Sequence, residues 1–411
     1  MKLALIADDF SGAADAAAPF AHAGYCCRVV PAKNLAALKT PGTDILSVDL
    51  DTRQITDDAA LVRKRTRAAC RRLIEARPDL VFKKIDSALR GNLRVELDAV
   101  MASLRLSCAV ICPAFPANHR TISSGRLHVA AQAGVSPNDG CCVRAMFQAQ
   151  ETPTKEVSLE ELRAGMLPLH SWIERGVRMV FCDAVLDSDL DEVAREALRH
   201  PATVLPVGSA GLAAAVARAI TPQAGAIERK IGALTGEELR ALVVVGSRRP
   251  EARRQAAALT GRMEIIPVTL ENELSGAAIA AREIAARFDA GDRVALLISK
   301  EEDVPGRPSS VLGAAAAHAA RQLAADWPVV PVVAIGGETA RAVFDALGAK
   351  SMRVMGELEP GAAWGEVEGE QGSWICGRVR LAVRSGSFGD DFALARYIGI
   401  TGAGIEHGRN G

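Results

Sequence analysis

Short apolar runs that each end at acidic, polar or glycine residues recur along this chain, and this alternation limits its fold more than any other feature. The first run, residues 3–7, leads directly into Asp8 and Asp9 and then into a small-residue turn that opens an alanine-rich helix closed by Gly24. Apolar runs separated by helical segments are typical of parallel strands joined by crossover helices. The sequence therefore predicts an α/β protein.

The same pattern predicts two series of strands. The first series is expected at 45–50, 80–85, 108–112, 177–182 and 203–207, with a long helix over 57–76. The second series is expected at 242–245, 294–298 and 332–335. Because the pattern is lost at 221–236, we expect two domains, 1–225 and 236–411, each a mainly parallel sheet flanked by helices. An active-site cleft between the two domains is the economical arrangement.

Composition excludes several classes of function. Lysine plus arginine equals aspartate plus glutamate at 49 each, so the net charge gives no reason to expect a nucleic-acid partner. No window resembles a membrane span, and no cleavable signal follows the first residues, so we expect a cytoplasmic protein. The nine cysteines include no Cys-x-x-Cys motif, which indicates reduced thiols rather than a zinc or redox site.

The acid pair Asp8–Asp9 stands where the first predicted strand ends. In parallel sheets, ligands bind at the carboxyl ends of the strands. One carboxylate there can take a hydroxyl proton or hold a metal ion while the other positions the substrate. For either aspartate by itself, the alternative is a simple N-cap of the following helix.

A second polar stretch follows the strand predicted at 80–85. Within ten residues it holds Lys83, Lys84, Asp86, Ser87, Arg90 and Asn92. Basic side chains suit a carboxylate, and the acid, hydroxyl and amide groups suit the hydroxyls of a small polyhydroxylated anion. The two lysines cannot face the same way on a strand, and the acid with its serine could instead be only a helix N-cap. Arg53, at the exit of another strand, could contribute a further arginine.

Three glycine loops lie in the second predicted domain. Gly336, Gly337, Glu338 and Thr339 form a glycine pair followed by a helix start, Ser247 follows a strand and a glycine, and Ser385 and Gly386 lie in a glycine-punctuated loop. Glycines let phosphates approach backbone N–H groups, and helix N-termini favour negative charge. Neither a Walker A motif nor G-x-G-x-x-G is present, so each loop is a weak signal, but together they predict a nucleotide site.

Six short motifs, in this order, resemble the four-carbon acid sugar kinase family from residue 5 to about residue 395. They are residues 6–13 (IADDFSGA), 83–92 (KKIDSALRGN), 113–116 (PAFP), 208–212 (GSAGL), 336–339 (GGET) and 385–389 (SGSFG). The resemblance implies an ATP-dependent kinase, using Mg²⁺, that phosphorylates the terminal hydroxyl of D-threonate, D-erythronate or 3-oxo-tetronate. D-threonate is our first choice of substrate.

The resemblance also implies roles for the residues. Asp8 or Asp9, Arg53 and the segment 84–87 would line a substrate site in the N-terminal domain. Ser247, the loop 336–339 and Gly386 would contact ATP in the C-terminal domain. Phosphoryl transfer asks mainly for positioning and charge neutralisation.

On this basis we expect Asp9 to accept the proton of the attacking hydroxyl, or with Asp8 to hold Mg²⁺. Lys84 and Arg90 would bind the substrate carboxylate. Ser11 and Ala88 stand where the family commonly has threonine, which bears on the choice of substrate.

Two other classes compete with a kinase. A sugar-acid dehydrogenase or isomerase is disfavoured because the dinucleotide fingerprint is absent. A non-catalytic sugar-acid binding protein is disfavoured because two adjacent acids repel an anionic ligand. The sequence does not decide whether the chain forms a homodimer, whether residues 117–170 form a lid, or which residues bind the metal ion. The partners that it predicts are the acid sugar and ATP.

Overall fold

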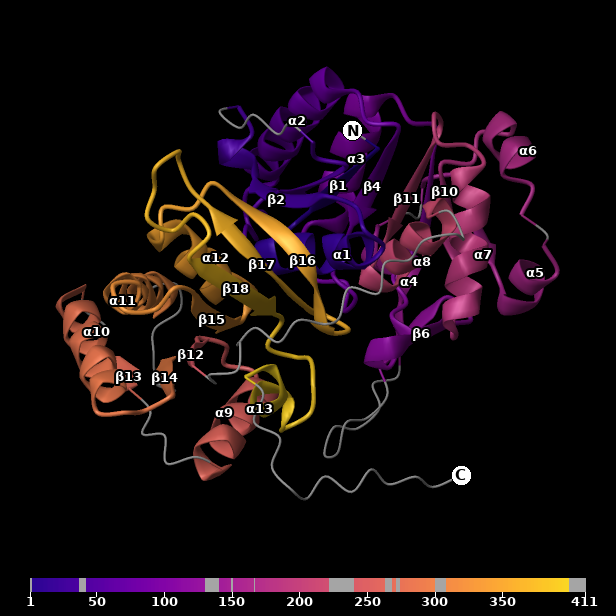
Figure 1. Cartoon of the computed structure of the whole chain (residues 1–411). Coiled ribbons are helices and arrows are strands. Elements are labelled where there is room, and N and C mark those ends of the chain that lie inside the picture. The colour runs from indigo at the N-terminus through magenta and orange to yellow at the C-terminus, as the bar shows by residue number, and fades with distance from the viewer. Residues whose placement is uncertain are drawn as a thin grey trace. The chain divides into compact units, whose positions relative to one another are not determined.

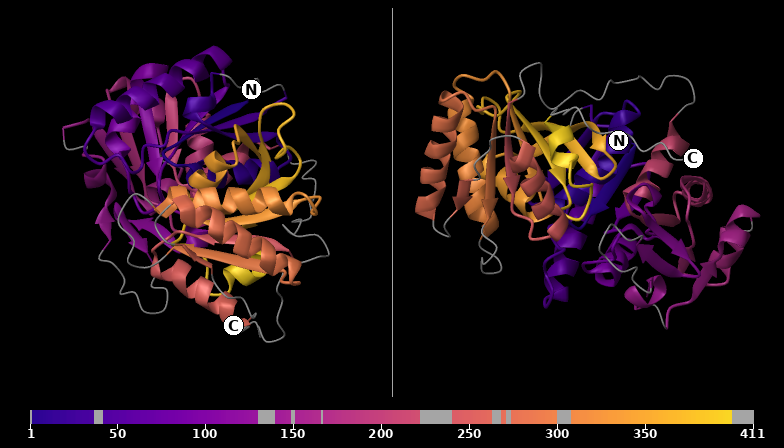
Figure 2. Two further views of the ribbon diagram at one scale, coloured as in Figure 1. Left: turned by 90° about the vertical axis from the view of Figure 1, so that its left-hand side faces the viewer. Right: turned by 90° about the horizontal axis from the view of Figure 1, so that it is seen from below.

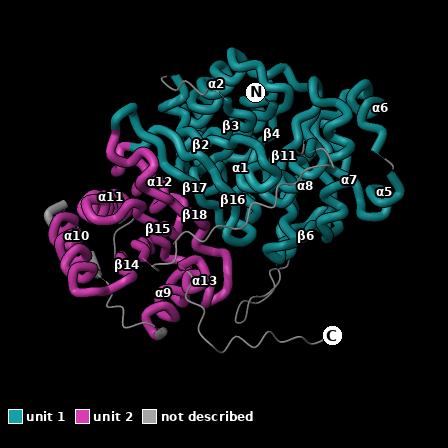
Figure 3. The backbone as a smooth tube through the Cα atoms, in the orientation of Figure 1, with its two compact units in different colours: residues 1–229, 349–372 teal, residues 230–348, 373–411 magenta. Residues whose placement is uncertain are grey.

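The computed structural model describes residues 2–36, 42–129, 140–148, 151–165, 167–221, 240–262, 268–270, 274–299 and 308–398. The chain divides into two compact units, one formed by residues 1–229 with 349–372 and the other by 230–348 with 373–411 (Figure 3). These units differ from the predicted domains 1–225 and 236–411 because residues 349–372 join the first unit. Apart from Thr221, the predicted boundary at 221–236 lies outside the described residues.

The first unit is built on one large, mainly parallel sheet (Figure 1). Its strand order is β17 (Ala362–Glu368), β16 (Ser351–Glu359), β2 (Cys27–Pro31), β3 (Ile45–Asp49), β1 (Leu3–Ala7), β4 (Leu80–Lys84), β11 (Val204–Gly208), β5 (Cys108–Cys112), β10 (Met179–Cys182) and β9 (Thr154–Val157). All neighbours from β2 to β9 are parallel, whereas β16 pairs antiparallel with both β17 and β2. A small antiparallel sheet contains β6 (Arg120–Ser123), β7 (Arg126–Val129) and β8 (Cys141–Cys142).

Helices cover this sheet. They are α1 (Phe10–His22), α2 (Ala59–Ala76), α3 (Leu93–Leu104), α4 (Val143–Met146), α5 (Leu159–Arg163), α6 (Leu169–Glu174), α7 (Asp187–Leu198) and α8 (Ala210–Ile220), with 3₁₀ turns at Ala32–Asn34 and Pro116–Asn118. The helices α2 and α3 pack on each other, while α1, α8 and α7 pack in series. Figure 2 shows helices of the first unit, indigo to magenta, against its strands. The alanines of α1 are buried, because small side chains let the helix lie close to the neighbouring strands β1, β3, β2 and β16 of the sheet.

The hairpin β16–β17 explains why residues 349–372 belong to the first unit. β16 pairs with β2 and packs on α1, and Arg28 of β2 forms an ion pair with Glu368 at 3.0 Å. Strand β2 was not predicted, because Arg28 interrupts its short apolar run. The region 117–170, for which the sequence leaves a lid open, holds the small sheet, β9, α4, α5 and the start of α6 among its described residues.

The second unit has a fully parallel sheet (Figure 1). Its order is β13 (Val268–Leu270), β14 (Val294–Ser299), β12 (Ala241–Val245), β15 (Val330–Ile335) and β18 (Val379–Arg384). The helices are α9 (Pro250–Arg262), α10 (Leu274–Asp289), α11 (Pro308–Leu323), α12 (Gly337–Ala346) and α13 (Ala393–Tyr397). Helices α10, α11 and α12 pack in series, and α9 packs with α13. Within the described residues, no helix is long and apolar enough to cross a membrane.

Candidate active site

Three neighbouring strands of the first unit bring the predicted substrate residues to one edge of its sheet. Strand β1 lies between β3 and β4, and all three run parallel. Their carboxyl ends therefore lie side by side. Asp8 and Asp9 follow β1, Arg53 lies four residues beyond β3, and Lys84 ends β4. The topology thus gathers residues that are up to about 80 positions apart in the sequence.

Arg53 ties the carboxylates of this edge together. Its Nε and Nη2 donate to the two oxygens of Asp8, each at 2.7 Å, and its Nη1 donates to Asp9. The same Nη1 lies 3.8 Å from Oδ1 of Asp86. The side chain of Arg53 is 11% exposed, so these are largely desolvated ion pairs. One arginine therefore holds three carboxylates in place.

Asp9 has two structural roles besides its pairing with Arg53. It is the N-cap of α1, where its Oδ1 accepts a hydrogen bond from the backbone N–H of Gly12 at 2.7 Å. Its Oδ2 accepts from the hydroxyl of Ser11 at 3.0 Å. The N-cap alternative thus holds for Asp9. Asp8 is the more deeply buried of the two carboxylates, which leaves Asp9 nearer to solvent.

Asp86 organises the turn after β4. The guanidinium of Arg90 donates to its two oxygens at 2.7 and 2.8 Å, and the backbone N–H groups of Ala88 and Arg90 add weaker bonds. Asp86 is therefore not the cap of α3, which begins only at Leu93. The neighbouring Ser87 accepts a hydrogen bond from Arg120 of β6.

The two lysines of β4 face different surroundings, as strand alternation requires. Lys83 Nζ forms a fully buried ion pair with Glu96 at 2.7 Å and also donates to two backbone carbonyls, so its three donors are used. Lys84 Nζ donates to the carbonyl of Ile85 at 3.2 Å and forms no ion pair with any described residue. Lys84 is buried, with an exposed fraction of 4%, although no ion pair within the described ranges neutralises it. It is the lysine with donors left for a ligand.

Asn92 serves the protein rather than a ligand. Its amide nitrogen donates to the carbonyls of Thr52 and Ile55, at 2.8 and 2.9 Å, and so holds the loop that carries Arg53. Thr52 in turn donates to Glu96, the partner of Lys83. Lys83 and Asn92, both predicted as substrate ligands, thus bind other protein groups: Lys83 pairs with Glu96, and Asn92 holds the loop of Arg53.

Charge–charge interactions fix the ionisation of Asp8 and Asp86. Burial by itself would raise the pKa of Asp8, but the charges of Arg53, Lys83 and Lys84 and the bonds from Arg53 lower it below its usual value. Burial likewise opposes ionisation of Asp86, and Arg53 and Arg90 more than offset it, so that its pKa is strongly lowered. Both groups are carboxylates at neutral pH.

Three residues of this edge were not singled out from the sequence. Arg120 donates to Ser87 from β6, within the region 117–170. Asp15 of α1 is a further carboxyl group near Lys84, Arg120 and Arg53, and Glu357 of β16 is a carboxyl group near Asp15. The signal for Asp15 was a lone acid in an alanine-rich helix. Nothing in the local sequence marks Glu357.

The glycine loops of the second unit also converge. Strand β15 lies between β12 and β18, so the loops that follow these three strands are neighbours. A Cβ built on Gly386 would lie 1.9 Å from the Oγ of Ser247, and one on Gly336 would lie 3.3 Å from the Cβ of Ser247. Gly336 has a φ of 110°, which only glycine adopts readily. Thr339 is buried behind this turn, and its neighbour Glu338 is exposed.

Replacing Gly386 with alanine is expected to weaken nucleotide binding about tenfold or more, equivalent to ~1.4 kcal/mol. The added methyl group cannot fit against Ser247, so the two loops must separate. Isothermal titration with ATP measures the effect. Gly261→Ala is the matched control, since nothing lies within 4 Å of its Cβ position. Equal affinities for both variants would contradict a nucleotide site at these loops.

The described residues offer no ready-made metal cage. No group of three or more His, Cys, Asp or Glu among them could hold a metal ion. Asp8 and Asp9, the carboxylates expected to hold Mg²⁺, are already bound by Arg53. A Mg²⁺ ion commonly keeps several waters and binds through substrate phosphates with only one or two carboxylates. The residues present therefore fit an ion carried chiefly by a nucleotide.

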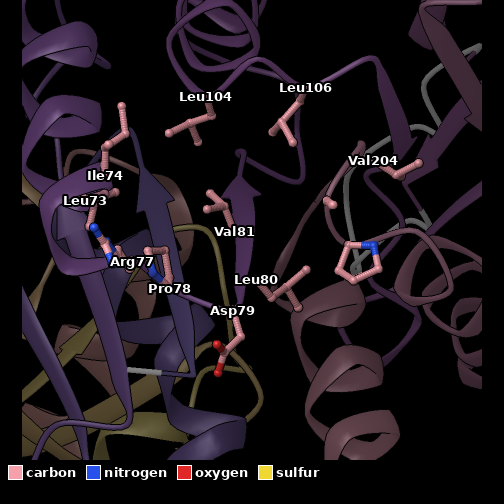
Figure 4. Close-up of a pocket in the computed structure, with 12 residues that line it drawn as sticks. Leu73, Ile74, Arg77, Pro78, Asp79, Leu80, Val81, Leu104, Leu106 and Val204 are labelled. Carbon is pink, nitrogen blue, oxygen red and sulfur yellow. The ribbon is translucent and has the colours of Figure 1, made fainter.

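A cavity of about 330 Å³ in the first unit lies away from these residues (Figure 4). Leu80 and Val204, which begin β4 and β11, line it together with Leu104, Arg77 and Asp79. It therefore lies at the amino ends of the strands, whereas Lys84 lies at their carboxyl ends. The cavity is separate from the candidate substrate site.

Comparison with known proteins agrees with a sugar site in the N-terminal part of the chain and a nucleotide site in the C-terminal part. Residues 3–216 match the sugar-binding N-terminal domain family, and residues 242–394 match the nucleotide-binding C-terminal domain family. The D-threonate kinases of Cupriavidus necator and Bordetella bronchiseptica are 31% and 30% identical to this chain, with 96% of each chain aligned. At 26% identity, relatives include a 3-oxo-tetronate kinase of Methylobacterium radiotolerans (95% of this chain, 97% of the relative) and a D-erythronate kinase of Heliobacterium modesticaldum (90% of each).

A solved structure has the same fold. It is described as a putative tRNA synthase from Salmonella typhimurium, is 24% identical, and superposes with a TM-score of 0.74 over 96% of this chain and 98% of its own. At this identity the likeness speaks for the fold only.

The fold and the two family matches define a two-domain α/β protein with a sugar-binding N-terminal domain and a nucleotide-binding C-terminal domain. The chain belongs to the four-carbon acid sugar kinase family. Both the family and the α/β fold expected from the sequence are confirmed.

Proposed function

We propose that this protein is an ATP-dependent kinase that phosphorylates the terminal hydroxyl of D-threonate. Membership of an acid sugar kinase family supports the reaction class. The relatives named D-threonate kinase are 28–31% identical to this chain, and those named 3-oxo-tetronate or D-erythronate kinase are 26–28% identical, which favours D-threonate as the substrate. The observation that carries the proposal is Lys84, a buried cation with unused donors beside an acid pair.

In this proposal Lys84 binds the substrate carboxylate. A charge-assisted bond to a desolvated ammonium is strong, and Lys84 has no protein carboxylate to give up first. Arg90 is the second candidate for the carboxylate, because its side chain is 36% exposed while its partner Asp86 is buried. Arg53 is fully committed to protein carboxylates and acts as a positioning residue.

Asp9 is the proposed acceptor of the hydroxyl proton. It is more exposed than Asp8, and the N–H of Gly12, the Ser11 hydroxyl and Arg53 fix its orientation. General-base help is modest in phosphoryl transfer, where positioning and charge neutralisation dominate. We therefore assign Asp9 chiefly to orienting the attacking hydroxyl.

The loops after β12, β15 and β18 are the proposed ATP site. Backbone N–H groups around Gly336 and the N-terminus of α12 suit phosphate oxygens, and the close approach of Gly386 to Ser247 leaves no room for side chains there. Mg²⁺ would enter bound to the phosphates, where it neutralises their charge.

The test is a coupled ADP-release assay with Mg-ATP against D- and L-threonate, D- and L-erythronate and the 3-oxo acids. We expect turnover with D-threonate to exceed that with every other member of the panel. Preference for D-erythronate or a 3-oxo acid would support the kinase reaction and contradict D-threonate as the substrate. A folded, ATP-binding protein that is silent across the panel would contradict the proposed function.

A further inference from the structure

Asp15 is a buried carboxyl group that takes part in none of the ion pairs described above. It lies on α1 and is 7% exposed. Its Oδ1 accepts no hydrogen bond from any described residue. Burial of a charged group without partners is strongly unfavourable, so a fold retains one mainly where a ligand supplies the missing bond.

The side chain of Asp15 shares a helix face with Gly12, three residues earlier, and helical side chains lean towards the N-terminus. A Cβ on Gly12 would lie 3.2 Å from Nζ of Lys84 and 2.7 Å from Oδ1 of Asp9. The charges that act on Asp15 are those of Lys84, Asp9, Arg120 and Arg53. Asp15 thus belongs to the edge where Lys84 would bind the substrate carboxylate.

Glu357 approaches the same place from β16, which packs on α1. Its carboxyl group forms no ion pair with a described residue. Burial first, and the charge of Asp15 second, raise the pKa of Glu357 to about 8. Burial and Asp9 raise the pKa of Asp15 to about 6 despite the nearby cations. Between these values Asp15 is a carboxylate and Glu357 is neutral.

We propose that Asp15 is a specificity residue whose carboxylate accepts a hydrogen bond from a secondary hydroxyl of the acid sugar, with Glu357 of β16 as its neighbour. This inference rests on the proposed function. An acid sugar bound to Lys84 through its carboxylate presents its C2 and C3 hydroxyls next to that lysine. Oδ1 of Asp15, a buried acceptor that lacks a donor among the described residues, is suited to accept a hydrogen bond from one of these two hydroxyls. Ionisation of Glu357 would place a second negative charge beside an anionic substrate and oppose its binding.

The test compares Asp15→Asn with the wild type on D-threonate and on its 2-deoxy and 3-deoxy analogues. We expect the wild type to prefer D-threonate over one of the two analogues by about 100-fold or more, because that analogue leaves Asp15 unpaired. In Asp15→Asn the kcat/KM for D-threonate should fall by a similar factor, while the kcat/KM for the analogue that lacks this hydroxyl should change little. Preference for the hydroxyl would then be lost.

The pH dependence gives a second readout. In the wild type, kcat/KM for D-threonate should fall below about pH 6, as Asp15 takes up a proton, and above about pH 8, as Glu357 loses one. Asp15→Asn should lose the acid limb, and Glu357→Gln should lose the alkaline limb. Asp98→Asn, on an exposed part of α3, is the control and should change neither limb.

Folding of the variants is checked by thermal unfolding. Because the pKa of Asp15 is raised on folding, its ionisation opposes the folded state once the pH exceeds about 6, and Asp15→Asn should therefore unfold at a higher temperature at pH 7.5. If Asp15→Asn lost kcat/KM equally on all three substrates and kept the acid limb, the inference would be overturned, but the proposed kinase function would not. A wild type inactive on every acid sugar would overturn the proposed function and this inference with it.

Discussion

Replacing Arg53 with methionine should lower the free energy of unfolding by about 3–5 kcal/mol, the cost of removing one partner from a buried ion pair. Asp8, whose side chain is 4% exposed, would keep its charge without its bidentate partner, and Asp9 and Asp86 would lose part of theirs. Guanidinium chloride unfolding at pH 7.5 measures the change. Activity should fall with it, since the acid pair would no longer be held in place.

The pH dependence and a control separate this effect from a general loss of packing. In the wild type the lowered pKa of Asp8 means that its carboxylate stabilises the fold above its unfolded pKa, and that this stabilisation is lost as the pH falls through the folded value. Without Arg53 the buried Asp8 takes up a proton more readily, so the deficit should narrow as the pH falls towards 5. Arg65→Met, which breaks an ion pair with exposed Asp51, should cost no more than about 0.5 kcal/mol. Equal costs for the two variants would contradict the role given to Arg53.

Replacing Lys84 with methionine should reduce kcat/KM for D-threonate by about 100- to 1,000-fold, in the range of 2–5 kcal/mol expected for a buried charged contact. Most of the loss should appear in KM, because the carboxylate lies at the opposite end of the substrate from the terminal hydroxyl. Affinity for ATP, which the second unit would bind, should be unchanged. Steady-state kinetics and ATP titration measure both.

Lys155→Met is the matched control for this variant, since Lys155 is also on a strand of the first unit but is 40% exposed and paired with Glu161. It should leave both constants unchanged. Lys84→Met should also remain folded, because Lys84 has a backbone carbonyl as its hydrogen-bond partner and no ion pair to lose. Normal D-threonate kinetics in Lys84→Met would refute the carboxylate assignment.

Local sequence was sufficient for most of the strands that carry the site. The apolar runs ending at Ala7, Lys84 and Val245 are strands in the structure, and the polar residues that follow them lie at the carboxyl ends of parallel sheets. Runs of this kind are recognisable because buried parallel strands are apolar on both faces.

Other parts of the site depend on pairing that no local pattern reveals. The hairpin β16–β17 joins the first unit through β2, more than 300 residues earlier, and carries Glu357 to α1. The functions of Lys83 and Asn92 likewise follow from partners elsewhere in the chain: Glu96 for the lysine, and the carbonyls of Thr52 and Ile55 for the asparagine. Short spacing within one motif made all its polar residues look like ligands, although half-buried turns also need polar residues for their own hydrogen bonds.

The measurement that tests the central claim most directly is the ³¹P NMR spectrum of the product formed from D-threonate and Mg-ATP. The account predicts one new phosphomonoester whose signal is split by the two protons of the terminal carbon. It also predicts that Lys84→Met forms the same product far more slowly. A phosphoester on a secondary carbon, an acyl phosphate, or hydrolysis of ATP to inorganic phosphate without an ester would contradict the claim that this chain is a terminal-hydroxyl acid sugar kinase.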